Sequence, residues 1–146
     1  KRHDEYLVVF DKFYQALEKV KKLNAVLVIA GDIFHNKSDL SPECVKIASD
    51  FLKNCADKIP TILTAGNHDA TLANKSRLDS LTPIVETLHH NNLYYLKNTD
   101  VYRYENILFN NFTFFIIIIC IIASSAMPHN FNIFRNIFFF KTERFF

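Results

Sequence analysis

Glycine is nearly absent from this sequence, in which Gly31 and Gly66 are the only two among 146 residues. Each follows a run of apolar residues and precedes polar or ionisable ones. Both glycines therefore mark the C-terminal end of a predicted strand, which is the edge where open α/β sheets bind ligands. The scarcity of glycine directs attention to two segments, 31–37 and 66–69, as the place where chemistry would occur.

Paired cysteines, a strong excess of one charge and a leader segment are also missing. Cys44, Cys55 and Cys120 are odd in number and form no Cys-x-x-Cys motif, which indicates reduced thiols inside a cell. The net charge of +2 gives no electrostatic reason to expect nucleic acid, although a local basic patch would suffice. The charged N-terminus lacks the apolar stretch of a signal peptide, so we expect an intracellular protein of the cytoplasm or nucleus, or a viral protein in the host cell.

Helical spacing is clear in three segments of the first 105 residues. Apolar residues three and four positions apart predict helices over 4–22, 42–57 and 77–90. Ser41 followed by Pro42 is a typical start for the second helix. The third contains Pro83, which disfavours a helix interior, so in an alternative interpretation this helix begins near Thr82 or is kinked there.

Strands are expected between these helices. An uninterrupted apolar run over 25–30 predicts a strand that is buried on both faces, as in a parallel sheet. The apolar and β-branched residues over 61–65 predict the next strand. Shorter strands are expected over 93–96, 101–105 and 107–109. Strand, helix and strand in this order form a βαβ unit, so we expect an α/β fold with a parallel sheet and a right-handed crossover.

The C-terminal part has a different composition. Residues 106–134 contain no Asp, Glu, Lys or Arg, and 112–127 are almost wholly apolar, close to the ~20 residues of a membrane span. Three interpretations compete: a membrane anchor, an apolar β region, or sequence foreign to the domain, since Phe, Ile, Asn and Lys have A/T-rich codons. We favour the last slightly over the anchor, and the β region least, because no turn residues divide the run. We therefore expect a domain over 1–109 and an atypical apolar tail over 110–146.

The two glycine-marked segments bring chemistry-bearing residues together: Asp32, His35, Asn67, His68 and Asp69. Adjacent parallel strands lie ~4.8 Å apart, so neighbouring strands would place these groups in one cleft. Carboxylate, amide and imidazole ligands suit Mn²⁺, Fe²⁺ or Zn²⁺. An Asp can bridge two metals ~3.5–4 Å apart, which activate water and hold a phosphate. A His that is not a ligand can protonate the leaving oxygen, and a neighbouring carboxylate can orient it.

Plainer interpretations of single residues exist. Asp32 alone is often a cap, Asn67 the left-handed residue of a turn, and His68 a structural histidine. His89 and His90 end a predicted helix, and we assign them to its C-terminal cap with no role in a site. A turn does not require the complete Gly-Asn-His-Asp run, however, and a Gly-Asp-x-x-His run follows the preceding strand. The pair of runs therefore favours a functional site.

In these two motifs the chain resembles the calcineurin-like metallophosphoesterases: Gly31-Asp32-Ile33-Phe34-His35 and Gly66-Asn67-His68-Asp69. The Gly-Asp-x-Phe-His form is similar to that of the DNA double-strand-break repair nucleases of the SbcD type, which include viral relatives. The resemblance covers roughly residues 2–109. It implies a partial β-sandwich flanked by helices, formed mainly by the βαβ units of the first sheet.

The resemblance also implies residue roles, cofactors and partners. Asp32 would bridge two divalent cations and Asn67 would bind one of them, with manganese favoured and iron or zinc as alternatives. His68 would be the acid or charge stabiliser, Asp69 would orient it, and His35 would be a second active-site histidine. DNA and an SbcC-type ATPase would be the partners of the intact protein.

Other motifs of the family are not found. The family has an Asp-x-His motif on its first strand, which His3-Asp4-Glu5 does not match. It also has a Gly-His-x-His motif, but no glycine follows Gly66, and His129 matches nothing. We therefore expect a fragment of a metal-dependent nuclease that is inactive as written. The alternatives are a non-catalytic binding or membrane-tethered scaffold fragment, and a phosphatase of the same fold.

Overall fold

The computed structural model of the chain describes residues 3–35, 40–70, 77–105, 107–112, 115–120 and 137–140. Helices and strands alternate in the first half, as the apolar patterns predict. The elements in chain order are α1 (His3–Lys21), β1 (Val26–Ala30), α2 (Pro42–Lys58), β2 (Thr61–Thr64), α3 (Thr82–Leu88), β3 (Leu93–Leu96), β4 (Asp100–Tyr104), β5 (Ile107–Phe112), β6 (Phe115–Cys120) and β7 (Ile137–Phe140). The expected mixed α/β fold is confirmed.

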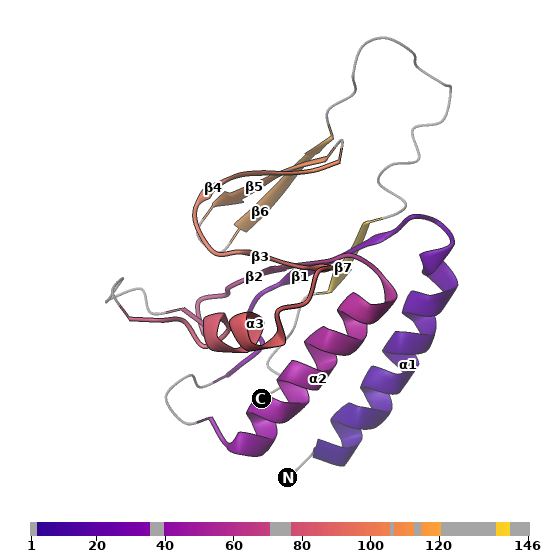
Figure 1. The fold of residues 1–146 in the computed structure, drawn as a ribbon, viewed down its shortest axis with the longest axis vertical. Helices are drawn as coiled ribbons and strands as arrows, with labels where there is room; N and C mark the ends of the chain where they lie inside the picture. The colour runs from indigo at the N-terminus through magenta and orange to yellow at the C-terminus, as the bar shows by residue number, and fades with distance from the viewer. Residues whose placement is uncertain are drawn as a thin grey trace.

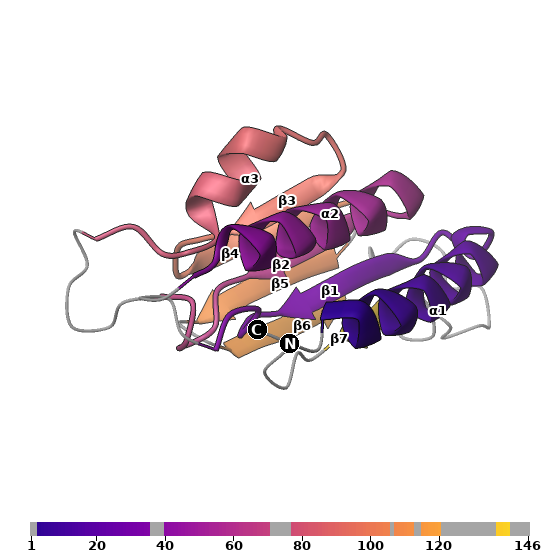
Figure 2. The same ribbon diagram turned by 90° about the horizontal axis from the view of Figure 1, so that it is seen from below.

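The strands form two sheets. One has the order β3-β2-β1-β7 with parallel neighbours throughout, and the other has the order β4-β5-β6 with antiparallel neighbours. The three helices lie on one face of the parallel sheet and the antiparallel sheet lies on its other face (Figures 1 and 2). Ala30, Thr64 and Leu96 are in register, so β1, β2 and β3 all end at the same edge.

The two faces of β1 explain why its sequence is apolar without alternation. Leu27 and Ile29 are fully buried in the core beneath the helices, together with Phe10 and Phe51, whose ring centroids are 4.4 Å apart. Val28 is equally buried, but it belongs to the core between the two sheets. A strand covered on both faces needs apolar residues at every position, which is the basis of the sequence prediction.

Helix starts follow local capping chemistry. The Ser41 hydroxyl accepts a hydrogen bond from the backbone N–H of Cys44 at 3.3 Å, and α2 begins at Pro42 as predicted. The third helix is the shorter of the two alternatives, because it begins at Thr82 directly before Pro83. The thiols of Cys44 and Cys55 are free, and burial raises the pKa of Cys55.

Parts of the expected apolar tail form strands in the described structure. Strand β5 runs through residue 112, β6 pairs antiparallel with it, and β7 pairs parallel with β1. These strands follow the β interpretation, which the sequence favoured least. Residues 113–114, 121–136 and 141–146 lie outside the described residues, and much of the span expected over 112–127 is among them. No helix in the described part of the chain is long and apolar enough to cross a membrane. The domain boundary at residue 109 stays a prediction.

Candidate metal site at the ends of two strands

Two loops leave the same edge of the parallel sheet side by side. The first loop, Gly31–His35, follows β1, and the second loop, Ala65–Ala70, follows β2. Ala30 and Thr64, the last residues of these strands, are partners in the parallel ladder. The adjacency of the two strands, on which the sequence prediction of a shared cleft depended, is therefore confirmed.

The two glycines allow the loops to touch through their backbones. Gly31 has φ +75°, and a Cβ atom there would lie on the backbone N and Cα of Gly66 and 2.7 Å from the carbonyl carbon of Ala65. A Cβ atom on Gly66 would lie on the backbone N and side chain of Asp32, 2.6 Å from its Cγ. Any side chain at either position would force the loops apart, so both glycines serve this one contact.

Asp69 holds the two loops together from within. Its carboxylate is fully buried and accepts three backbone hydrogen bonds: Oδ1 from Phe34 at 3.0 Å, and Oδ2 from Ile33 at 3.3 Å and from Gly66 at 2.9 Å. Burial raises the pKa of Asp69 above its ordinary value, although these donors act to lower it. The expectation that Asp69 orients the His68 ring is wrong, because the N–H groups of the loops occupy both carboxylate oxygens.

His68 is fixed to the first loop by two other contacts. Its backbone N–H donates to Asp32 Oδ1 at 3.0 Å, and its ring Nδ1 lies 3.0 Å from the backbone oxygen of His35. A carbonyl oxygen only accepts, so Nδ1 must hold the proton and Nε2 is left for other partners. The rings of His35 and His68 stack, with centroids 5.5 Å apart and an interplanar angle of 28°. The structure thus brings both predicted histidines together.

Asp32 and Asn67 complete the predicted group. Asp32 has φ 55°, a left-handed conformation that Asp tolerates. Asp32 is half-buried, as is His68, whereas Asn67 is exposed. The Asp32 carboxylate and the Asn67 amide are ligand types that suit Mn²⁺, Fe²⁺ or Zn²⁺, so these two residues fit part of a cation site. Among the described residues, no three His, Cys, Asp or Glu side chains gather closely enough to hold a metal ion. The Asn67 amide would therefore have to serve as a ligand beside Asp32.

Asp79 is a supporting residue that the sequence interpretation missed. Its carboxylate is 9% exposed and accepts from the backbone N–H groups of Leu81 at 3.0 Å and Thr82 at 2.7 Å, and from the hydroxyls of Thr82 at 2.6 Å and Tyr95 at 2.8 Å. The next residue, Ser80, donates its N–H to the backbone oxygen of Asp69 at 3.0 Å. The available signal was an acid shortly before Thr82-Pro83, because carboxylates are favoured near a helix N-terminus.

Asp79→Asn is expected to change how stability depends on pH. Burial raises the pKa of Asp79, but its hydrogen bonds from Thr82, Tyr95 and Leu81 outweigh burial and hold the pKa below the ordinary 3.8. A carboxyl with a lowered pKa stabilises the fold fully above 3.8 and loses that contribution as pH falls through the folded-state value. Urea unfolding should therefore show the wild type to be more stable by about 1–2 kcal/mol near neutral pH, with the difference shrinking in acid. A difference that does not vary with pH would contradict this role.

Comparison with known proteins adds an independent line of support. Residues 6–143 match the calcineurin-like phosphoesterase family model. An uncharacterized protein of Acanthamoeba polyphaga mimivirus is 44% identical to this chain over 110 residues. That alignment covers 74% of this chain but 8% of the viral protein, so the chain spans only a small part of that relative. The family match extends beyond residue 109 into the stretch expected to be a tail.

Proposed function

The chain belongs to the calcineurin-like phosphoesterase family, and from that premise we propose that its two loops form part of a centre for metal-dependent phosphodiester hydrolysis. Proteins of this family typically bind divalent metals, and the family supports phosphoester hydrolysis in general. The main observation behind the proposal is that two contacts hold the loops together: the hydrogen bonds of Asp69 and the close approach of the Gly31 and Gly66 backbones. These contacts keep Asp32, Asn67 and His68 at one edge of the sheet.

The ligands of the proposed centre come from both loops. Asp32 would be the bridging carboxylate and Asn67 a ligand to one cation, with manganese favoured and iron or zinc as alternatives. When bound, such cations supply Lewis-acid activation of water and of the phosphoryl oxygens. The chain's own contribution is to fix the donors: Asp32 Oδ1 is hydrogen-bonded to the His68 backbone, so the carboxylate cannot rotate freely.

His68 is the proposed proton donor. With Nδ1 bonded to the His35 backbone oxygen, the ring keeps one orientation and presents Nε2 as its remaining polar atom. A protonated Nε2 can donate to the leaving oxygen or stabilise charge on the phosphoryl group. His35 contributes its stacked ring and its backbone carbonyl, which takes the orienting role that the sequence suggested for Asp69.

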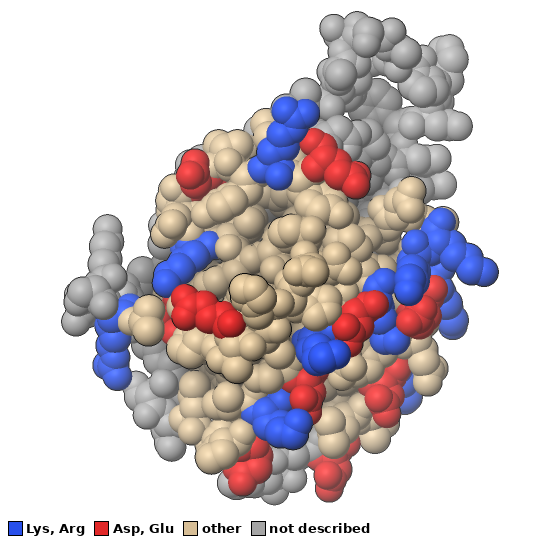
Figure 3. All heavy atoms as spheres, viewed as in Figure 1, with Lys and Arg blue, Asp and Glu red and all other residues tan. Residues whose placement is uncertain are grey.

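DNA is the proposed substrate, and the Gly-Asp-x-Phe-His form of the first motif supports it by its similarity to the SbcD-type nucleases. An SbcC-type ATPase partner and an intracellular setting, in a cell or in a virus-infected host, belong to the same proposal. Cations and anions are interleaved over α1 and α2 on the face that Figure 3 shows, without a large patch of one sign. Contact with a nucleic acid would accordingly be made at the loop edge and not across these helices.

Hydrolysis of bis-p-nitrophenyl phosphate in the presence of Mn²⁺ tests the proposal. The chain is expected to be nearly inactive, because its sequence contains neither the Asp-x-His nor the Gly-His-x-His ligands of the family. Any rate above that of Mn²⁺ alone should disappear in Asn67→Ala. Strong turnover that Asn67→Ala abolishes would contradict the incompleteness of the centre while supporting its location. Strong turnover that persists in Asn67→Ala would contradict the proposed site itself.

A further inference from the structure

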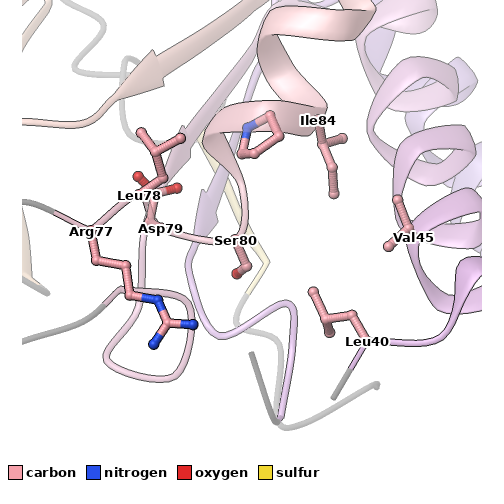
Figure 4. Close-up of a pocket in the computed structure, with 8 residues that line it drawn as sticks. Leu40, Val45, Arg77, Leu78, Asp79, Ser80 and Ile84 are labelled. Carbon is pink, nitrogen blue, oxygen red and sulfur yellow. The ribbon is translucent and has the colours of Figure 1, made fainter. Parts of the chain in front are cut away.

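A pocket of about 310 Å³ lies between the start of α2 and the start of α3 (Figure 4). Its size is at the lower end of the range for small-molecule sites, which are mostly apolar with a few placed polar groups. Most of its wall is apolar, formed by Leu40, Val45, Leu78, Pro83 and Ile84. The pocket therefore suits one mainly apolar group of modest size.

Hydrogen bonds connect this pocket to the candidate metal site. Ser80, in the pocket lining, donates its backbone N–H to the backbone oxygen of Asp69 at 3.0 Å and its hydroxyl to the same oxygen at 3.3 Å. Asp69 in turn ends the Asn67–His68 turn. The pocket lining and the turn are therefore joined through the Ser80–Asp69 hydrogen bonds.

The pocket also has a cation at its rim. Arg77 is exposed, and Figure 4 shows its side chain on the same side of the pocket as Ser80, across from Val45. No described acidic side chain forms an ion pair with it. Asp79 is the acid in the pocket lining, and both of its oxygens accept hydrogen bonds, from Leu81, Thr82 and Tyr95. The Nζ atom of Lys97 also lies 3.9 Å from Asp79 Oδ2. The rim of the pocket is therefore suited to an anion.

On the basis of the proposed function, we propose that this pocket binds the nucleoside next to the scissile phosphodiester, with Arg77 on the adjoining phosphate. An apolar wall suits the faces of a nucleobase, and the planar guanidinium group suits a phosphate in a bidentate geometry. A base can enter such a pocket only after it leaves a stacked duplex. The substrate class is therefore an unpaired nucleic-acid strand.

Binding of a short fluorescein-labelled oligothymidylate to the full chain, followed by fluorescence anisotropy at several salt concentrations, tests the proposal. Arg77→Ala should weaken binding about tenfold and reduce the salt slope of log affinity by about 0.7, the value for one phosphate contact on a single strand. The matched control is Arg103→Ala, an exposed position on β4 whose Nε donates to the backbone oxygen of Glu105. It removes the same charge and should change neither quantity.

A second comparison tests the base-binding part. The wild type should bind oligothymidylate more tightly than an abasic strand of the same length. Leu78→Asp should remove that preference, and it should not disturb the core because Leu78 is 61% exposed. The proposal would be overturned if Arg77→Ala and Arg103→Ala lost equal affinity for oligothymidylate, or if the wild type did not prefer oligothymidylate to the abasic strand.

Failure of this proposal can be told apart from failure of the proposed function. If the chain binds Mn²⁺ in a manner sensitive to Asp32→Asn but binds no oligothymidylate, the nucleoside pocket is refuted and the metal centre stands. If neither Mn²⁺ nor oligothymidylate binds, the proposed function is refuted together with the pocket.

Discussion

Replacing Gly31 by alanine is expected to lower the free energy of unfolding by about 4 kcal/mol, among the largest effects of any single substitution. The left-handed φ of +75° alone costs a non-glycine residue roughly 1–2 kcal/mol. The larger part comes from the new Cβ atom, which would lie on backbone atoms of Gly66. Backbone atoms cannot move aside as a flexible side chain can, so the two loops must separate.

Asn24→Ala is the control for this prediction, measured in the same urea titrations. Asn24 also has a left-handed φ, 51°, in the turn after α1. Alanine at this position would be strained by the left-handed φ but would meet no opposing loop. Asn24→Ala should therefore lower the free energy of unfolding by about 1 kcal/mol. If Gly31→Ala and Asn24→Ala cost the same, the direct contact of the two glycines would have no energetic importance.

Asp69→Ala is expected to destabilise the chain by about 3–5 kcal/mol. It would leave the N–H groups of Ile33, Phe34 and Gly66 buried without an acceptor, and each such group costs about 1–3 kcal/mol, partly relieved by relaxation of the loops. Asp69→Asn keeps the shape and one acceptor oxygen, so it should cost less, about 1–2 kcal/mol. If Asp69→Ala and Asp69→Asn lowered the free energy of unfolding equally, the side chain would stabilise the fold through its volume and not through its oxygens.

The pH dependence of the Asp69→Asn effect follows from the raised pKa of Asp69. The folded state holds this carboxyl proton more tightly than the unfolded state, so wild-type stability from this group increases as pH falls toward the ordinary value of 3.8. Asp69→Asn has no such proton. The difference in unfolding free energy between the two proteins should therefore widen as pH falls between neutral and 3.8. A difference that narrows over this range would mean that the backbone donors dominate the pKa.

The sequence predicted the position of the candidate site because its signal is local. An apolar run that ends in glycine marks a strand end, and two such runs separated by one helix are often neighbouring parallel strands, as β1 and β2 are. The role of Asp69 was not predictable in the same way. Adjacency in sequence suggested that it pairs with His68, but the turn directs the carboxylate inward, where N–H groups from the opposite loop satisfy it. That arrangement depends on the other loop, which no local pattern reveals.

The strands beyond residue 112 were hard to predict for a different reason. Strand β6 is a run of Phe, Ile and Cys without alternation, and no glycine or proline separates it from β5. A uniform apolar run gives the same pattern for a strand, a buried helix or a membrane segment. In the described structure, β6 is a strand that pairs with β5. The composition of a strand does not reveal which other strand it pairs with.

Titration of Mn²⁺ into the chain, followed by the loss of its free-ion electron paramagnetic resonance signal, tests whether the two strand-end loops form a divalent-cation site with Asp32 as a ligand. We expect saturable binding of one Mn²⁺, weakened at least about tenfold in Asp32→Asn. Asp11→Asn, an exposed acid on α1, removes the same charge and should bind like the wild type. No saturable binding, or equal binding by the wild type and Asp32→Asn, would refute a cation site at these loops.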